Sequence, residues 1–454
     1  MSTASRRRIE VAGAVAVAGA LVLSAGWNVA RDRARSEPRV IIATVADAAT
    51  VSSGVDPVVT WRRGAEAVIA DRLADDLAAR EAELAATVPS GMCVAIRVAN
   101  LPLLRLGDPA PEIGRAQSLV VLAAAVEELG TAHRFTTEIV APAPIDGVID
   151  GDVWLIGGGD PLLGSERVTA LMGADGVVRP TRADALAAAL AVAGIAEITG
   201  DIVGDGRYFD GERRPAEWPD TVPLSEAGRI AGLTIDSGRI WVDPRNVAFD
   251  PVQAAARTLI DMLAVRDVVV RGAATTAGRA AAPPPDATRI AQVGSVPLAT
   301  ATAAWTAESV LPPADVAETL LRHLGVGRSG EGSRVAGAAA VREMTAGWGV
   351  EPAGLIDGSG IASGSGVGCD TLLVAHERLS AAVGGVPAQI SNVVGVIDSR
   401  GIGDDGAEYR VLAAGIVPSP DDLATVHAAA VELVTTAPEL PPLSLAMPRD
   451  GEPS

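Results

Sequence analysis

The chain has 454 residues, 48% of them hydrophobic, which suffices for two or three domains with substantial cores and excludes an intrinsically disordered protein. Its formal net charge is −19 at pH 7 and no basic run occurs beyond the extreme N-terminus, which excludes nucleic acid as a partner. All 37 basic residues are arginine, so the chain lacks the lysine amine that Walker phosphate loops, protein kinases, Schiff-base enzymes and Ser/Lys hydrolases require.

An uncharged stretch from Val11 to Ala30 lies between two arginine clusters near the N-terminus. A helix of this length spans about 30 Å, the thickness of the hydrocarbon core of a bilayer. No clear small-x-small cleavage site is present, which favours an uncleaved membrane helix within residues 1–35, with the body outside the cytoplasm, over a cleaved signal and a secreted protein. Residues 36–59 are expected to form a linker.

The next segments carry clear periodicity. Apolar residues recur at helical spacing among charged ones from Ile69 to Leu84, which predicts an amphipathic helix. The sequence MCVAIRV at Met92–Val98 is typical of a strand. Leu119–Leu129 is apolar almost all round over its first two turns, which predicts a buried helix ending at Gly130.

Between about residues 135 and 293 the sequence changes to short strands, turns and Ala-rich helices, and a Pro-rich run at Ala282–Asp286 marks a loop near its far end. After it, helical Ala/Leu-rich sequence returns. This pattern predicts one domain, formed by 60–134 and 294–436, that is split by a large insertion over 135–293. A Pro-rich tail, 437–454, is expected to be disordered.

Cysteine and histidine usage gives no sign of a metal site. Cys93 and Cys369 lack the paired spacing of zinc ligands and form either one disulfide outside the cytoplasm or two buried thiols. The four histidines are scattered and are expected to be surface or packing residues: His133, His323, His376 and His427.

Two glycine-rich segments are candidates for phosphate binding, GGGDP at Gly157–Pro161 and DGSGIASGSGVG at Asp357–Gly368. Neither fits G-x-G-x-x-G. In the second segment, Gly358 and Gly360 are followed by Ser363 where the third glycine should be. We therefore interpret both as tight turns beside strands and expect no nucleotide and no other cofactor.

Five further segments follow one another with a distinctive order and spacing. They are LGTAHRFTTEIV (Leu129–Val140), GDVWLIGGGDPLL (Gly151–Leu163), GDIVGDGRYFDG (Gly200–Gly211) with Trp218-Pro219 after it, SVPLA (Ser295–Ala299), and AETLLRHLG (Ala317–Gly325) leading to IDGSGI (Ile356–Ile361). In this order, from about Met92 to Val434, the chain resembles the D-alanyl-D-alanine carboxypeptidase/endopeptidase family, the class C penicillin-binding proteins. The resemblance implies an α/β serine transpeptidase/β-lactamase-like domain, split by a mostly β inserted domain and here preceded by one membrane helix.

The family's chemistry, as the resemblance implies it, depends on three motifs. A serine attacks the D-Ala-D-Ala carbonyl and the lysine of S-x-x-K deprotonates it, since residues i and i+3 share a helix face. The S-x-N motif and a K-T-G strand move protons and hold the substrate carboxylate.

The first motif has no counterpart here. Aligned on Leu129-Gly130, the nucleophile's position holds Arg115 and the lysine's position holds Ser118, while a one-residue slip gives Ala116 and Leu119. Neither register supplies a serine followed by a lysine.

The other two motifs are also missing. Aligned on Ala317-Glu318, the S-x-N positions hold Pro312 and Ala314. The only segment in the K-T-G interval is VPAQIS at Val386–Ser391, which has no lysine. No catalytic residue of the family is therefore retained.

These observations predict a catalytically inactive envelope protein that binds peptidoglycan or cell-wall proteins. The alternative is a residual serine peptidase with a rebuilt site, in which His133 or Glu127 activates Ser118. In either case we expect Arg115 to pair with an internal carboxylate or to turn to solvent.

Overall fold

The computed structural model describes residues 80–98, 103–172, 178–307, 311–383, 396–402, 408–415 and 420–435, which all belong to one compact unit. The membrane helix expected at Val11–Ala30, the linker at 36–59 and the tail at 437–454 lie outside these residues. Within them, no helix is both long and apolar enough to cross a membrane. Of the amphipathic helix expected from Ile69 onward, residues 80–87 are described, and they are helical with Leu84 buried.

The strand predicted from MCVAIRV forms the middle of an antiparallel sheet. The sheet has the strand order β15 (Val396–Ile402), β16 (Glu408–Gly415), β1 (Met92–Val98), β2 (Leu104–Gly107). Successive side chains of a strand point to opposite faces, so Ala95 of β1 enters one hydrophobic core while Val94 and Ile96 enter another. Both faces of this sheet are therefore buried.

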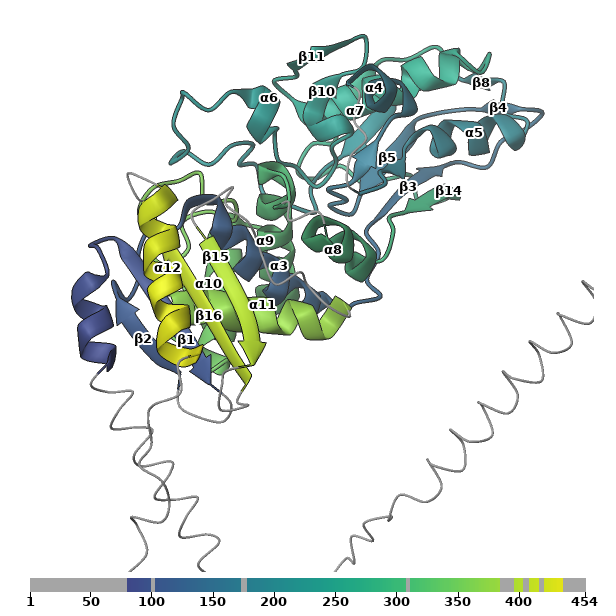
Figure 1. The fold of residues 1–454 in the computed structure, drawn as a ribbon. Coiled ribbons are helices and arrows are strands. Elements are labelled where there is room, and N and C mark those ends of the chain that lie inside the picture. Colours follow the sequence, from purple (N-terminus) through teal and green to yellow (C-terminus); the bar gives the residue numbers. More distant parts are fainter. Residues whose placement is uncertain are drawn as a thin grey trace, which may run out of the picture. The chain divides into compact units, whose positions relative to one another are not determined.

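Helices cover the two faces. The helices beyond residue 87 and outside the inserted segment are η1 (Gly114–Gln117), α3 (Ser118–Leu129), α8 (Leu298–Ala307), α9 (Ala314–Ser329), α10 (Arg334–Gly347), α11 (Cys369–Val383) and α12 (Pro420–Thr435). Helix α11 packs on β1 and β16 from one side, and α12 packs on β15 and β16 from the other (Figure 1). Helix α3 contacts α8, α9, α10 and α11. The buried helix predicted to end at Gly130 is confirmed, since residues 118–126 are all buried and Gly130 follows with a φ of 90°.

The segment between α3 and α8 forms a second sheet. Its strand order is β13 (Ala274–Thr276), β9 (Ile202–Asp205), β5 (Val153–Gly157), β3 (Thr136–Ala141), β14 (Thr288–Gly294). The first and last strands of the segment are neighbours, with Thr136 paired to Gly294, so the chain enters and leaves at the same place. The Pro-rich loop predicted at Ala282–Asp286 lies between β13 and β14, as expected.

The expectation that this segment is mostly β needs correction, because it is mixed α/β. Strand β9 is parallel to both β5 and β13, and parallel neighbours require long connections, which here include α5 (Asp184–Val192) and α7 (Pro251–Ala264). The shorter elements are α4 (Glu166–Met172), α6 (Leu224–Ala227), η2 (Asp236–Gly238), β4 (Val148–Ile149), β6 (Leu163–Gly164), β7 (Thr181–Arg182), β8 (Glu197–Ile198), β10 (Arg239–Ile240), β11 (Asp243–Val247) and β12 (Val269–Val270).

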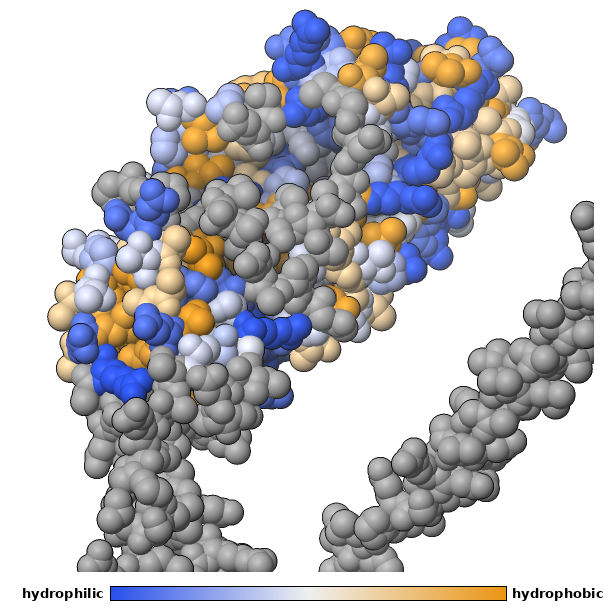
Figure 2. Space-filling model, viewed as in Figure 1, coloured by the Kyte–Doolittle hydropathy of each residue, from blue (hydrophilic) through white to orange (hydrophobic). Residues whose placement is uncertain are grey.

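Separate hydrophobic cores support the two sheets. One core lies between the first sheet and α3, α9 and α11 and includes Leu122 and Leu321. The other lies within residues 139–291 and includes Leu155 and Leu259. On the face shown in Figure 2, hydrophobic side chains of the described residues are interspersed among hydrophilic ones.

A disulfide joins Cys93 of β1 to Cys369 at the start of α11. The sequence left open whether these cysteines form a bridge or remain as two buried thiols, and the structure has the bridge. It ties the sheet to a helix that lies 276 residues further along the chain.

Candidate functional site

The candidate site lies where the start of α3 meets the start of α9 and the loop at 357–362. Arg115, in η1, donates from Nη1 to the carbonyl of Ser359 at 3.0 Å and from Nη2 to the carbonyl of Pro312 at 2.6 Å. Burial lowers the pKa of this guanidinium, and the carboxylates of Asp357 and Asp315 act in the opposite direction. We expected Arg115 to pair with a carboxylate or to turn to solvent, but its hydrogen bonds are to two backbone carbonyls. Arg115 ties α9 to the loop.

The hydroxyl nearest to this position is not free. The Ser118 side chain is fully buried, and its Oγ donates to the carbonyl of Arg115 at 2.8 Å. This bond spans the turn of η1 that leads into α3. A nucleophilic serine needs an exposed oxygen and a base that can take its proton, and Ser118 lacks the exposure.

Neither suggested activating group bonds to Ser118. Glu127 accepts hydrogen bonds from Trp348 Nε1 at 3.0 Å and Arg378 Nη1 at 2.6 Å. It lies nine residues along α3 from Ser118, which is about 13 Å of helix. The ring of His133 packs 4.8 Å from that of Phe135.

The S-x-N positions lie at the start of α9. Pro312 is buried and contributes only its carbonyl to Arg115. Ala314 is the first residue of α9 and is 4% exposed. The structure therefore brings Arg115 and Pro312 together with no side-chain hydroxyl or amide from α9. The segment Val386–Ser391 lies outside the described residues.

Asp357 is the centre of the hydrogen bonds at this site, a role that the sequence did not indicate. Its side chain is fully buried. One oxygen accepts from Gln117 Nε2 at 2.8 Å and Gly360 N at 3.0 Å, and the other accepts from Trp218 Nε1 at 2.7 Å and Ser359 Oγ at 2.5 Å. Trp218 belongs to the inserted segment, so this carboxylate joins three distant parts of the chain. The DGSG sequence at Asp357–Gly360 predicted a turn, but it did not indicate the partners of the carboxylate.

Both glycine-rich segments form close backbone approaches, which confirms them as turns. A Cβ on Gly159 would lie 2.6 Å from Nε2 of His323, whose ring instead contacts the carbonyl of Gly159 at 2.7 Å. A Cβ on Gly360, which has a φ of 75°, would lie 1.9 Å from the carbonyl oxygen of Gly114. Burial lowers the pKa of His323 to about 4, so this histidine is a neutral packing residue at pH 7.

A buried arginine on α9 joins the inserted segment to the rest. The Arg322 side chain is 0% exposed, and it pairs with Asp210 at 2.6 Å, with Glu212 at 3.0 Å and with Glu318 at 3.5 Å. Burial raises the pKa of Glu318 to about 7, against the effect of the Arg322 charge. The sequence showed this pair only as part of AETLLRHLG.

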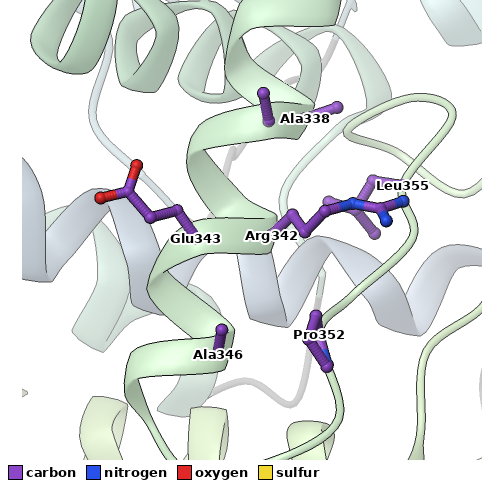
Figure 3. Close-up of a pocket in the computed structure, with 7 residues that line it drawn as sticks. Ala338, Arg342, Glu343, Ala346, Pro352 and Leu355 are labelled. Carbon is purple, nitrogen blue, oxygen red and sulfur yellow. The ribbon is translucent and has the colours of Figure 1, made fainter.

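A pocket of about 460 Å³ lies between α10 and the segment that follows it. Figure 3 shows Arg342 reaching across it toward Leu355, while Glu343 points away from the same helix. The other lining residues are Ala338, Ala339, Ala346 and Pro352. No hydroxyl, thiol or imidazole lines this pocket, so it has no group suited to acyl transfer.

Comparisons with known proteins agree with the order of segments. The family model described as D-Ala-D-Ala carboxypeptidase 3 (S13) matches residues 115–277. A D-alanyl-D-alanine carboxypeptidase from Actinomadura sp. (strain R39) is 28% identical over 324 residues, which is 56% of this chain. The match spans 57% of that protein's length.

Solved structures share the fold. Penicillin binding protein 4 from Haemophilus influenzae superposes with a TM-score of 0.56 at 16% identity, over 78% of this chain and 99% of that one. The same protein complexed with a β-lactam gives a TM-score of 0.51 over the same shares of the two chains, again at 16% identity. The mixed α/β fold is thus similar to that of penicillin binding protein 4.

Proposed function

We propose that the chain is a catalytically inactive member of the D-Ala-D-Ala carboxypeptidase family that binds peptidoglycan peptides or cell-wall proteins without cleaving them, supported by the family model, the curated relative and the shared fold. An intact frame with an altered site is compatible with a binding role, because fold alone does not determine activity.

One observation carries this proposal. At the position that aligns with the family's nucleophile, the Arg115 guanidinium is fixed by the carbonyls of Ser359 and Pro312. A guanidinium is protonated in proteins and has no lone pair to offer as a nucleophile or base. The absence of lysine from the whole sequence removes the usual base as well.

The second candidate is a residual serine peptidase that uses Ser118. Its only support is the position of this hydroxyl one residue beyond the turn that holds Arg115. Activity would require the Ser118 side chain to leave its bond to the Arg115 carbonyl and to become exposed.

Incubation with a labelled penicillin is expected to leave the intact mass of the protein unchanged. A β-lactam traps the serine that attacks the substrate, and no exposed serine stands at that position. Mass spectrometry of the intact protein makes the measurement, with penicillin binding protein 4 from Haemophilus influenzae as the positive control.

The variant Ser118→Ala distinguishes the two candidates. If the proposal holds, the variant and the unaltered protein both remain unlabelled. A stoichiometric adduct on the unaltered protein that disappears in Ser118→Ala would instead establish the residual peptidase.

We further propose that a membrane helix at Val11–Ala30 holds the protein at the cell membrane with its body outside the cytoplasm, on the basis of the uncharged stretch between two arginine clusters. Cell fractionation is expected to recover the protein with membranes, and N-terminal sequencing is expected to find the stretch intact. A mature N-terminus near Gly26 in the soluble fraction would mean that the segment is a cleaved signal.

A further inference from the structure

The inserted segment carries an arginine-rich cavity far along the chain from Arg115. Its volume is about 380 Å³, and six residues line it: Gly211, Arg213, Arg214, Arg229, Phe249 and Asp250. At Gly211 an added Cβ would meet no atom within 4 Å, so the cavity is open beside this residue. A volume of this size fits a ligand about as large as a short peptide end.

The two neighbouring arginines are held by backbone carbonyls. Nη2 of Arg214 donates to the carbonyls of Pro219 and Val222 at 2.9 and 3.0 Å, and its guanidinium lies 5.4 Å from the ring of Trp218. Nη1 of Arg213 donates to the carbonyl of Asp210 at 3.2 Å. These bonds orient the guanidinium groups, and since carbonyls carry no net charge, they do not form ion pairs with the two arginines.

The third arginine lies beside an exposed aromatic ring. The Arg229 guanidinium is 5.4 Å from the ring centre of Phe249, which is 87% exposed, and its Nε is buried without a hydrogen-bond partner. The Phe249 ring therefore presents an apolar surface to solvent beside the Arg229 cation.

The only carboxylate in the lining is already engaged. Asp250 caps α7, accepting from the backbone N–H groups of Val252 and Gln253, and it also accepts from Thr276 Oγ1 at 2.9 Å. Among the described residues, no carboxylate forms an ion pair with any of the three arginines. Three cations and one anion therefore face a cavity in a protein whose net charge is −19.

The three arginines of the cavity outnumber its one carboxylate, so the cavity can accept a further anion. Burial lowers the pKa of Arg213 despite the opposing charges of Asp250 and Asp210, and the charge of Arg322 acts in the same direction as burial. A bound carboxylate would offset both effects, since a guanidinium pairs with a carboxylate through two parallel hydrogen bonds.

We propose that this cavity binds the free carboxylate end of a short peptide, with the arginines on the carboxylate and Phe249 against the apolar part of the last residue. The inference rests on the proposed binding function and places it in the inserted segment, away from the site around Arg115. A second pocket of about 450 Å³ shares Phe249 and Asp250 with the first and extends past Gln253 and Arg257, which gives room for residues further back along the peptide.

Calorimetric titration with a pentapeptide ending in D-Ala-D-Ala tests the proposal. We expect saturable binding, and at least tenfold weaker binding of the same peptide with its C-terminus amidated, because amidation removes the charge that the arginines compensate. Equal binding of acid and amide would overturn the proposal, and so would displacement of the peptide by an equal concentration of inorganic phosphate, which would mark a general anion site.

Variants locate the site. Arg229→Met and Phe249→Ala are each expected to weaken binding at least tenfold while unfolding at the temperature of the unaltered protein, since Phe249 is exposed and Arg229 forms no described ion pair. Arg279→Met, at an exposed arginine that lines neither pocket, is the matched control and should bind normally.

Arg115→Ala separates this cavity from the site at α3. If Arg115→Ala abolishes peptide binding while Arg229→Met does not, the ligand occupies the site at α3 and the cavity proposal is wrong. This result is independent of the penicillin experiment, in which an adduct would contradict catalytic inactivity and leave the cavity untouched.

Discussion

Replacement of Arg322 by alanine is expected to lower the free energy of unfolding by about 3–5 kcal/mol, because it leaves the buried carboxyl of Glu318 without its cation. Arg322 is 0% exposed, and Glu318 beside it is equally buried. Asp210 and Glu212, its other two partners, come from the inserted segment. The loss should therefore also loosen this segment from α9.

Urea unfolding followed by circular dichroism measures the effect, and the same helix offers a control. Arg328 on α9 pairs with Glu128 and Glu343, but its side chain is 37% exposed, so Arg328→Ala should cost less than about 1 kcal/mol. If the two variants unfold at the same urea concentration, the buried ion pairs of Arg322 contribute no more to stability than the exposed ones of Arg328, and the inference is wrong.

Removal of the disulfide is expected to destabilise the protein by about 2–5 kcal/mol. The bridge between Cys93 and Cys369 closes a long loop, with 276 residues of sequence separation, and so restricts the unfolded chain. The double variant Cys93→Ser/Cys369→Ser and the reduced protein should show similar losses in urea unfolding.

A thiol assay checks that Cys93 and Cys369 form the disulfide. The native protein should contain no free thiol before reduction and two after it, as both cysteines of the chain lie in this bridge. Two reactive thiols in the unfolded, unreduced protein would show that the bridge does not form.

The sequence predicted the elements whose signals are local. The MCVAIRV strand and the apolar helix that ends at Gly130 are present as expected, because their periodicity and cap lie within a few residues. The resemblance, which rested on the order of five segments, agrees with the family model and the relative that match this chain. The mixed α/β character of the insertion was missed because two-residue strands such as β8 carry almost no periodic signal.

The candidate site was predictable only in part. Its altered positions, Arg115 and Ser118, follow from counting along one helix. The partners of Arg115 do not, because Ser359 and Pro312 lie about 200 residues away or more and contribute only backbone carbonyls. Asp357 and Arg322 were missed for the same reason, since their bonds to the inserted segment depend on the tertiary fold.

The pairing of β1 with β16 means that the first sheet is completed later in synthesis than the inserted sheet. Met92 pairs with Gly415, so β1 cannot pair with β16 until the end of the chain has been synthesised. The inserted sheet depends only on strands between Thr136 and Gly294 and has its own core. It can fold first during synthesis, while the edge of β1 that pairs with β16 stays unpaired and prone to aggregation until the last strands emerge.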